Sequence, residues 1–118
     1  MSKLSRTKGH AWENLCCHAL AQAGIRAKRN LTETREGNSG DLEVSNAPLE
    51  VQCKTGANPS VWRAVAEAVE VAEASGRFPV ALIHRDARKP GEKSTEIAAM
   101  PLDWYIEMLT LLKGMGVW

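Results

Sequence analysis

Two segments that alternate apolar and polar residues, followed by a helical segment and an apolar one, constrain this chain more than any other feature. Residues 41–45 and 49–54 each place apolar side chains at every second position, which is typical of strands with one buried face. The short segment between them predicts a β-hairpin. The helical pattern over 60–75 and the apolar run over 79–84 then predict a right-handed crossover to a strand parallel to the second hairpin strand.

The remaining periodicities complete an α/β architecture. Apolar residues at helical spacing predict two more helices, at 8–23 and after Pro101 to 114, and weaker alternation predicts strands at 25–31 and 95–100. Either Asn58 or Ser60 can cap the crossover helix, and Gly76 can end it. With 118 residues and no internal repeat or linker, we expect one domain, 1–118, with a central mixed sheet flanked by helices.

The charge distribution is uneven along the chain. The formal net charge is only +1, which by itself argues against a nucleic-acid partner. Residues 1–36, however, carry seven basic and three acidic side chains, and residues 77–93 carry five and two, while the other segments are acidic. These two basic segments can contact the phosphates of a nucleic acid, and the candidate contacts are Arg6, Lys8, Arg85, Arg88 and Lys89.

Cellular location can also be inferred from the sequence. No apolar run approaches the roughly 18 residues of a membrane span, and the first 24 residues are too charged for a signal peptide. The three cysteines have no paired spacing that would indicate a disulfide framework. We therefore expect a cytoplasmic protein with no membrane partner.

Polar side chains of the predicted hairpin converge on one face of the sheet. A two-residue loop would place Asp41 opposite Gln52, whereas a four-residue loop would place it opposite Lys54. In both registers the three side chains are direct or diagonal neighbours. A solvated hairpin often carries such residues simply because its outer face is wet, so the pattern alone does not establish a site.

This group of residues suits metal-assisted hydrolysis of a phosphodiester. Mg²⁺ prefers oxygen ligands and retains several waters, so few protein ligands suffice. Asp41 would be the principal ligand, the Gln52 amide a neutral ligand and the Cys53 carbonyl a third. Lys54 would orient the attacking water and offset the negative charge that develops on the phosphate.

A wider order of residues resembles a known family. Lys8-Gly9 and Glu13 in the first helix precede Gly-Asn-Ser-Gly-Asp41 and then Glu50-Val-Gln52-Cys-Lys54. This order resembles the PD-(D/E)xK nuclease superfamily, and within it the archaeal and phage-type Holliday junction resolvases. The resemblance implies a restriction-endonuclease-like core (αβββαβ plus a C-terminal helix). It also implies a homodimer that cuts four-way DNA junctions in recombination, in a bacterial or phage-infected cell. The metal implied is Mg²⁺, and Mn²⁺ can substitute for it.

The resemblance also implies roles for individual residues. Glu13 matches the helix acid that contacts metal-bound water, and Asp41, Gln52 and Lys54 match the metal ligands and the catalytic lysine. Ser39 matches the active-site loop, and Arg29 matches a residue that contacts DNA. For the dimer the sequence adds only a hint, because the tail residues Met115, Val117 and Trp118 are apolar.

Two departures from the family pattern leave alternatives open. Gly40 stands where the superfamily has proline, which we expect to change only loop geometry. Gln52 replaces the usual acid and should weaken metal binding, although Glu50 two residues earlier could supply a carboxylate. Glutamine there also resembles Mrr-type restriction endonucleases. The alternatives are therefore an Mrr-like or other nuclease of this superfamily, or a DNA-binding module of the same fold without catalysis.

Overall fold

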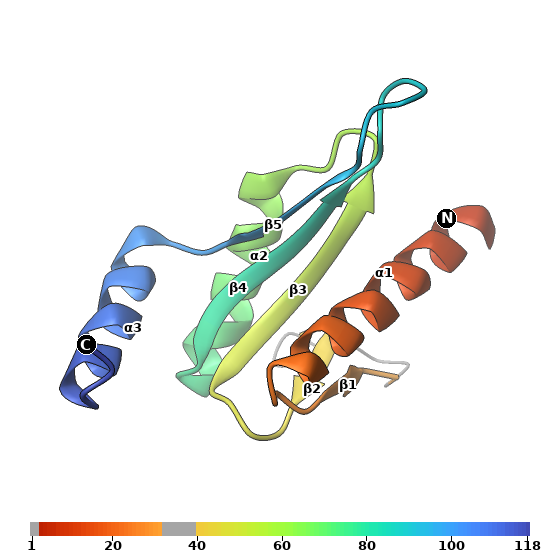
Figure 1. The fold of residues 1–118 in the computed structure, drawn as a ribbon. Helices are drawn as coiled ribbons and strands as arrows, with labels where there is room; N and C mark the ends of the chain where they lie inside the picture. The colour runs from red at the N-terminus through yellow and green to blue at the C-terminus, as the bar shows by residue number, and fades with distance from the viewer. Residues whose placement is uncertain (1–2, 32–39) are drawn as a thin grey trace.

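A five-stranded mixed sheet organises the chain (Figure 1). A computed structural model describes residues 3–31 and 40–118, with side chains described from residue 7 onward. The strands follow the chain order β1-β2-β3-β4-β5, and only β3 and β4 are parallel. Their bounds are β1 Ala27–Arg29, β2 Leu42–Val44, β3 Leu49–Gly56, β4 Phe78–Arg85 and β5 Thr95–Ala99. The expected hairpin and parallel crossover are confirmed.

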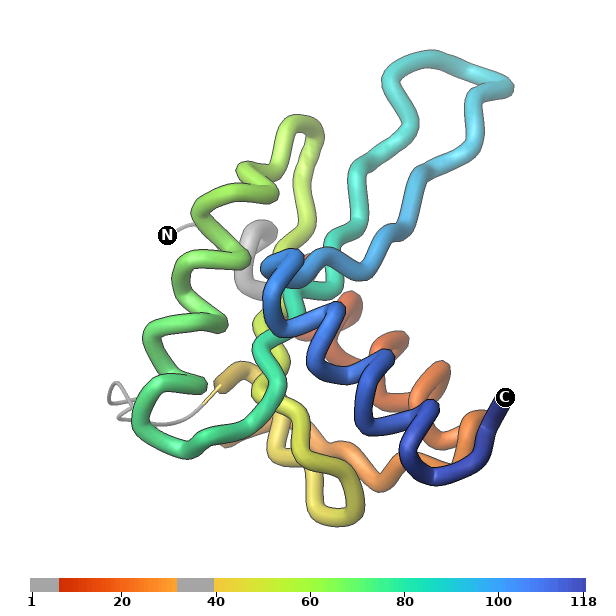
Figure 2. Tube along the Cα trace, turned by 90° about the vertical axis from the view of Figure 1, so that its left-hand side faces the viewer, coloured from red at the N-terminus to blue at the C-terminus, as the bar shows by residue number. Residues whose placement is uncertain are grey.

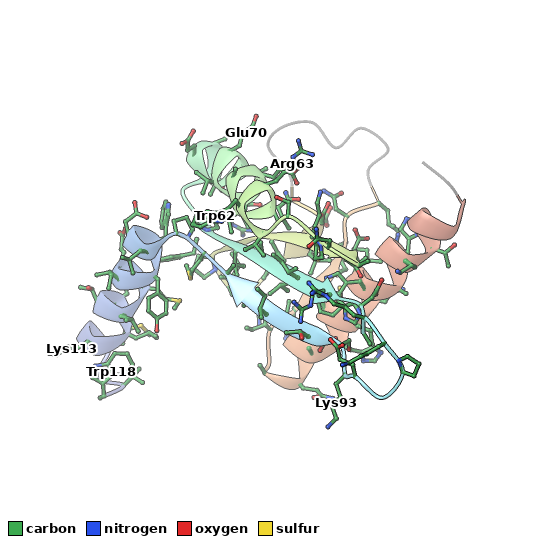
Figure 3. The ribbon with its side chains drawn as sticks, turned by 90° about the horizontal axis from the view of Figure 1, so that it is seen from above. Trp62, Arg63, Glu70, Lys93, Lys113 and Trp118 are labelled. Atoms are coloured by element: carbon green, nitrogen blue, oxygen red, sulfur yellow. The ribbon has the colours of Figure 1, made fainter. Side chains whose placement is uncertain are left out.

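Three helices accompany the sheet: α1 Lys3–Gln22, α2 Val61–Ser75 and α3 Leu102–Gly114. Seen from above, α1 and α2 lie on opposite faces of the sheet (Figure 3). The Ser60 side chain caps α2 by accepting a hydrogen bond from the backbone N–H of Arg63. Gly76 ends the helix with a φ of 72°, a left-handed conformation that glycine adopts without strain. Of the two cap residues left open by the sequence, the structure thus selects Ser60.

The core consists of two layers, one on each face of the sheet. On the α1 face, Trp12 and Cys16 pack against β2 and β3, and the Trp12 indole donates a hydrogen bond to the Leu82 carbonyl at 2.9 Å. On the α2 face, Ala64 packs against Ala81 and Ile83 of β4. Small side chains at this contact let the helix approach the sheet closely.

The first strand is shorter than the alternation suggested. Residues 25–31 were expected to be extended, but β1 covers only Ala27–Arg29. The backbone N–H of Ile25 instead bonds to the Leu20 carbonyl and belongs to the turn that ends α1. The backbone N–H of Asn30 bonds to the Asp41 carbonyl beyond the end of β2. The other residues of this segment therefore form the connections before and after a short strand.

The register of the hairpin selects one of the two alternatives. Leu42 pairs with Val51, which corresponds to the two-residue loop. Beyond this pair the regular register ends, because the Asp41 N–H bonds to the carbonyl of the same Val51. None of the helices in the described part of the chain is long and apolar enough to span a membrane.

Candidate functional site

Asp41 lies directly before β2, and hydrogen bonds hold its backbone from both neighbouring strands. Its N–H bonds to the Val51 carbonyl at 2.9 Å, and its carbonyl accepts the Asn30 N–H at 3.0 Å. The Asn30 side chain, only 1% exposed, donates to the Gly40 carbonyl at 3.0 Å. No pattern in the sequence indicated a role for Asn30, yet its buried side chain holds the backbone of Gly40, directly before Asp41.

The Asp41 carboxylate binds the backbone of β3. Its Oδ2 accepts a hydrogen bond from the Cys53 N–H at 2.8 Å. This bond forms because β3 continues to Gly56, whereas β2 begins only at Leu42 and so cannot pair with Cys53. The charged Asp41 carboxylate thus accepts the hydrogen bond of a β3 backbone N–H that has no partner in β2. Asp41 therefore lies beside the segment from Gln52 to Lys54, as the hairpin pattern predicted.

Gly40 approaches β3 too closely to carry a side chain. A Cβ at this position would lie 2.7 Å from the Val51 carbonyl oxygen and 3.3 Å from Oε2 of Glu50. Our expectation that glycine here changes only loop geometry is therefore incomplete, because the contact is with the strand itself. The close approach is what allows Asp41 to reach the Cys53 N–H.

Gly40→Ala is accordingly expected to destabilise the protein by about 1–3 kcal/mol, because the added methyl group must push the residues before β2 away from β3. Urea unfolding measures the change. The matched control is Gly9→Ala in α1, where an added Cβ meets no atom within 4 Å and helix propensity should increase stability slightly. Equal stability of the Gly40 variant and the wild type would contradict this contact.

Gln52 and Lys54 project from β3 toward the side of α2. Both are partly buried, and Glu50 on the same strand face is only 7% exposed. Lys54 Nζ lies 3.7 Å from Oε2 of Glu67 in α2, but both side chains are more than a third exposed, so this ion pair is weak. The polar face of the hairpin is thus covered in part by a helix and is not a fully solvated outer face.

Glu13 lies on α1, on the other face of the sheet. It is 6% exposed, and its Oε1 accepts a hydrogen bond from Nε of Arg29 at 3.0 Å. The negative charges of Glu13 and Asp41 both act on the Cys53 thiol. Glu13 therefore approaches the Asp41 region from the α1 side, and Arg29 is held in a partly buried ion pair with it.

Cys53 is strongly held in its thiol form. A hydrogen bond with Cys16 contributes most to the raised pKa of the Cys53 thiol, and burial and the charges of Asp41 and Glu13 raise this pKa further. The thiol therefore stays protonated above the ordinary value of 9.0. In the unfolded chain the Cys53 thiol ionises near pH 9.0. The stabilisation from this group is therefore fully present below pH 9.0, and the free energy of unfolding decreases as the pH rises above that value.

At pH 8 we expect iodoacetamide to modify Cys53 at least about tenfold more slowly in the folded protein than in urea, because the thiolate is the reactive form. Mass spectrometry of proteolytic peptides measures the two rates. Equal rates in the folded and unfolded protein would show that the thiol is neither buried nor bonded to Cys16.

The predicted metal ligands form a sparse oxygen donor set. Among residues 3–31 and 40–118, no three His, Cys, Asp or Glu side chains are grouped so that they could hold a metal ion. The set predicted from the sequence instead combines the Asp41 carboxylate with the Gln52 amide and the Cys53 carbonyl, while the Glu13 carboxylate is paired with Arg29. Such ligands suit Mg²⁺, which retains most of its waters, better than an ion that requires several protein ligands.

The amino-terminal part of the first basic segment meets the second one at one end of the molecule, whereas Arg26, Lys28 and Arg29 lie on or beside β1, after the other end of α1. Nζ of Lys8 in α1 pairs with the Asp86 carboxylate, and the Asp86 N–H bonds to the Gly56 carbonyl at the end of β3. The hydrogen bond from Lys8 holds the pKa of Asp86 below its usual value. Figure 1 shows the amino-terminal half of α1, the ends of β3 and β4 and the β4–β5 hairpin at this same end.

The predicted DNA contacts differ in their surroundings. Arg88 and Lys89 are exposed on the β4–β5 hairpin. Arg85 donates to Thr95 Oγ1 at 3.4 Å, and its Nε is buried without a hydrogen-bond partner in the described part of the chain. Ser39 and the side chain of Arg6 lie outside the described residues.

A small polar cavity lies beside Asp41 on the α2 side of the sheet. It has a volume of about 180 Å³ and is lined by Asn30, Gly40, Leu42, Glu43, Val44, Glu50 and Arg77. A larger cavity of about 860 Å³ lies near the end of α1 and contains none of the predicted site residues. Neither cavity is lined by Asp41, Gln52, Cys53 or Lys54, but the smaller one is lined by Glu50 and by Gly40, which is next to Asp41.

Comparison with known proteins adds no relative: the chain matches no protein-family model and no curated protein sequence.

Proposed function

We propose that this protein is a Mg²⁺-dependent endonuclease that cleaves branched DNA, with a PD-(D/E)xK active site similar to that of Holliday junction resolvases. One observation supports the proposal most. The Asp41 carboxylate binds the Cys53 N–H, which sets an acid beside an amide and a lysine spaced as in that motif. Lys8 of the first basic segment meets the β4–β5 hairpin at the end of β3 that follows Lys54, where these cations can bind phosphates.

In this proposal Asp41, Gln52 and the Cys53 carbonyl would hold Mg²⁺, which would supply a more nucleophilic water and stabilise charge on the phosphate. The water oxygen bonds to phosphorus and releases a proton to solvent, the bond from phosphorus to the leaving oxygen breaks, and that oxygen takes up a proton from solvent. Lys54 donates hydrogen bonds to the attacked phosphate and offsets its developing negative charge. The weak pair with Glu67 leaves the Lys54 ammonium able to turn toward the phosphate. The resemblance assigns Glu13 to metal-bound water, and in the structure its carboxylate is paired with Arg29 on the α1 side.

Gln52 favours one alternative within the same superfamily. Glutamine at this position removes a negative charge from the predicted ligand set. It also resembles the residue of Mrr-type enzymes, which cut duplex DNA. The exposed cations Arg88 and Lys89, however, suit contacts with phosphates, which carry no sequence information. We therefore favour recognition of DNA shape. A module that binds DNA without cutting it is the remaining alternative.

Cleavage of synthetic DNA separates these functions. The purified chain is incubated with a four-way junction, a matched linear duplex and a single strand, each in Mg²⁺, in Mn²⁺ and in EDTA. We expect paired, metal-dependent incisions in the junction and little cutting of the other substrates. Preferential cutting of the duplex would favour the Mrr-like alternative. Absence of cutting in both metals, with binding retained, would establish the non-catalytic module.

A further inference from the structure

A further small cavity, which we call the Arg85 pocket, lies between the start of α2, the end of β4 and the start of β5. It has a volume of about 250 Å³. Its polar lining side chains are Asn58, Arg85 and Thr95, and its other lining residues, Ile83 and Ile97 among them, are apolar. Figure 2 shows the segment before α2 and the β4–β5 hairpin at the same end of the molecule. The pocket contains none of the predicted metal ligands.

The register of the sheet directs Arg85 and Thr95 into this pocket. Ala81 and Ile83 of β4 face α2, and Arg85 follows them at the same alternation. Thr95 of β5 pairs with Arg85 and therefore projects to the same side. On the other side the β3 partner of Arg85 is Gly56, which has no side chain. The guanidinium thus has a hydroxyl beside it on one strand and no side chain on the other.

The Arg85 guanidinium lacks a counter-charge. It carries five N–H donors. Within the residues that the structure describes, it makes one long hydrogen bond, from Nη2 to Thr95 Oγ1 at 3.4 Å, and its Nε is buried without an acceptor. The pocket lining includes no Asp or Glu. A partly buried cation with so few acceptors costs free energy, which a bound anion would offset.

The start of α2 favours an anion at the same place. No acidic residue lies in the first turn of this helix of 15 residues, so no carboxylate offsets the partial positive charge of its first N–H groups. Asn58, just before the helix, adds an amide donor. The pocket thus combines one full positive charge with N–H and O–H donors, which together match the several oxygens of a phosphate.

We infer that the Arg85 pocket binds a phosphate group. The Arg85 guanidinium binds two of its oxygens, and the Asn58 amide and the Thr95 hydroxyl donate to the others. The charge pattern of the sequence indicated Arg85 only as one phosphate contact on a basic segment. In the structure it is instead separated from the exposed Arg88 and Lys89 and enclosed with two residues to which the sequence gave no binding role. The inference does not rest on the nuclease proposal.

Calorimetric titration of the full chain with inorganic phosphate tests the inference, without metal or DNA and with sodium chloride holding the ionic strength constant. We expect one phosphate per chain. Arg85→Gln should weaken binding at least about tenfold, because it removes charge-assisted hydrogen bonds. Thr95→Val removes only a hydroxyl from an exposed strand position, so it should fold and weaken binding about threefold.

The matched control is Arg63→Gln, which removes the same charge from an exposed side chain of α2 that does not line the pocket. Phosphate affinity should change less than about twofold in this variant, and circular dichroism checks that all three variants fold. Absence of phosphate binding would overturn the inference, as would equal weakening in Arg63→Gln and Arg85→Gln. If Arg85→Gln does not fold, an unchanged affinity in Thr95→Val overturns it.

Competition with a short single-stranded oligonucleotide identifies the source of the phosphate. An oligonucleotide with a 5′-phosphate that displaces inorganic phosphate better than its 5′-hydroxyl counterpart would indicate the end of a strand. Equal displacement by both would indicate a phosphate within a strand, and displacement by neither a free phosphate. All three outcomes support the pocket if they depend on Arg85. Because no cleavage is measured, a chain that cuts no DNA could still bind phosphate here, and a nuclease that fails to bind it would overturn this inference alone.

Discussion

Replacing Lys54 by alanine is expected to slow Mg²⁺-dependent cleavage of a four-way junction by about 10²–10³-fold, the usual effect of removing one group that stabilises transition-state charge. Lys54 lies two residues after Gln52 on the same face of β3. Its only ion pair in the described part of the chain is the weak one with Glu67 at 3.7 Å, so the ammonium can turn toward a phosphate. Single-turnover cleavage under saturating protein measures the chemical step separately from binding.

Junction binding, measured by fluorescence anisotropy in Ca²⁺, should change by less than about threefold in Lys54→Ala, since one phosphate contact among several is lost. The matched control is Lys28→Ala on β1, which removes the same charge from a side chain that is 78% exposed and pairs with Glu43. Its cleavage rate should equal that of the wild type. A wild-type rate in Lys54→Ala would place the active site elsewhere.

Most of the fold follows from local patterns in the sequence. Alternation and a short loop specified the β2–β3 hairpin, and Gly76 specified the end of α2, whereas the start of α2 was left open between Asn58 and Ser60. These features depend on residues that are close in sequence, where periodicity and capping act directly. The parallel pairing of β3 with β4 also followed, because the helix between them returns the chain to the end of the sheet at which β3 begins.

Contacts between distant segments could not be predicted in the same way. The sequence placed Asp41 near Gln52, but nothing in it showed that the Asp41 carboxylate would bind the Cys53 N–H or that Gly40 would touch Val51. Both depend on where β2 begins relative to β3. The meeting of Lys8 with Asp86, which brings the amino-terminal part of α1 to the second basic segment, depends on the angle of α1 across the sheet. The same long-range geometry pairs Glu13 with Arg29.

That ion pair leads to a second large effect. Arg29→Ala is expected to lower the free energy of unfolding by about 3 kcal/mol, because it removes the counter-charge from a carboxylate whose side chain is 8% exposed. Urea unfolding at neutral pH measures this change. The family resemblance implies instead that Arg29 contacts DNA, and in that role its loss would weaken DNA binding and leave stability nearly unchanged.

A double variant separates the two roles of Arg29. Glu13→Gln removes the buried charge, so adding Arg29→Ala to it should cost far less stability than Arg29→Ala alone. Arg26→Ala, an exposed arginine near the start of β1, is the matched control and should change stability by less than about 0.5 kcal/mol. If Arg29→Ala has the same effect in both backgrounds, the arginine does not stabilise the fold through Glu13, and the DNA-contact role regains support.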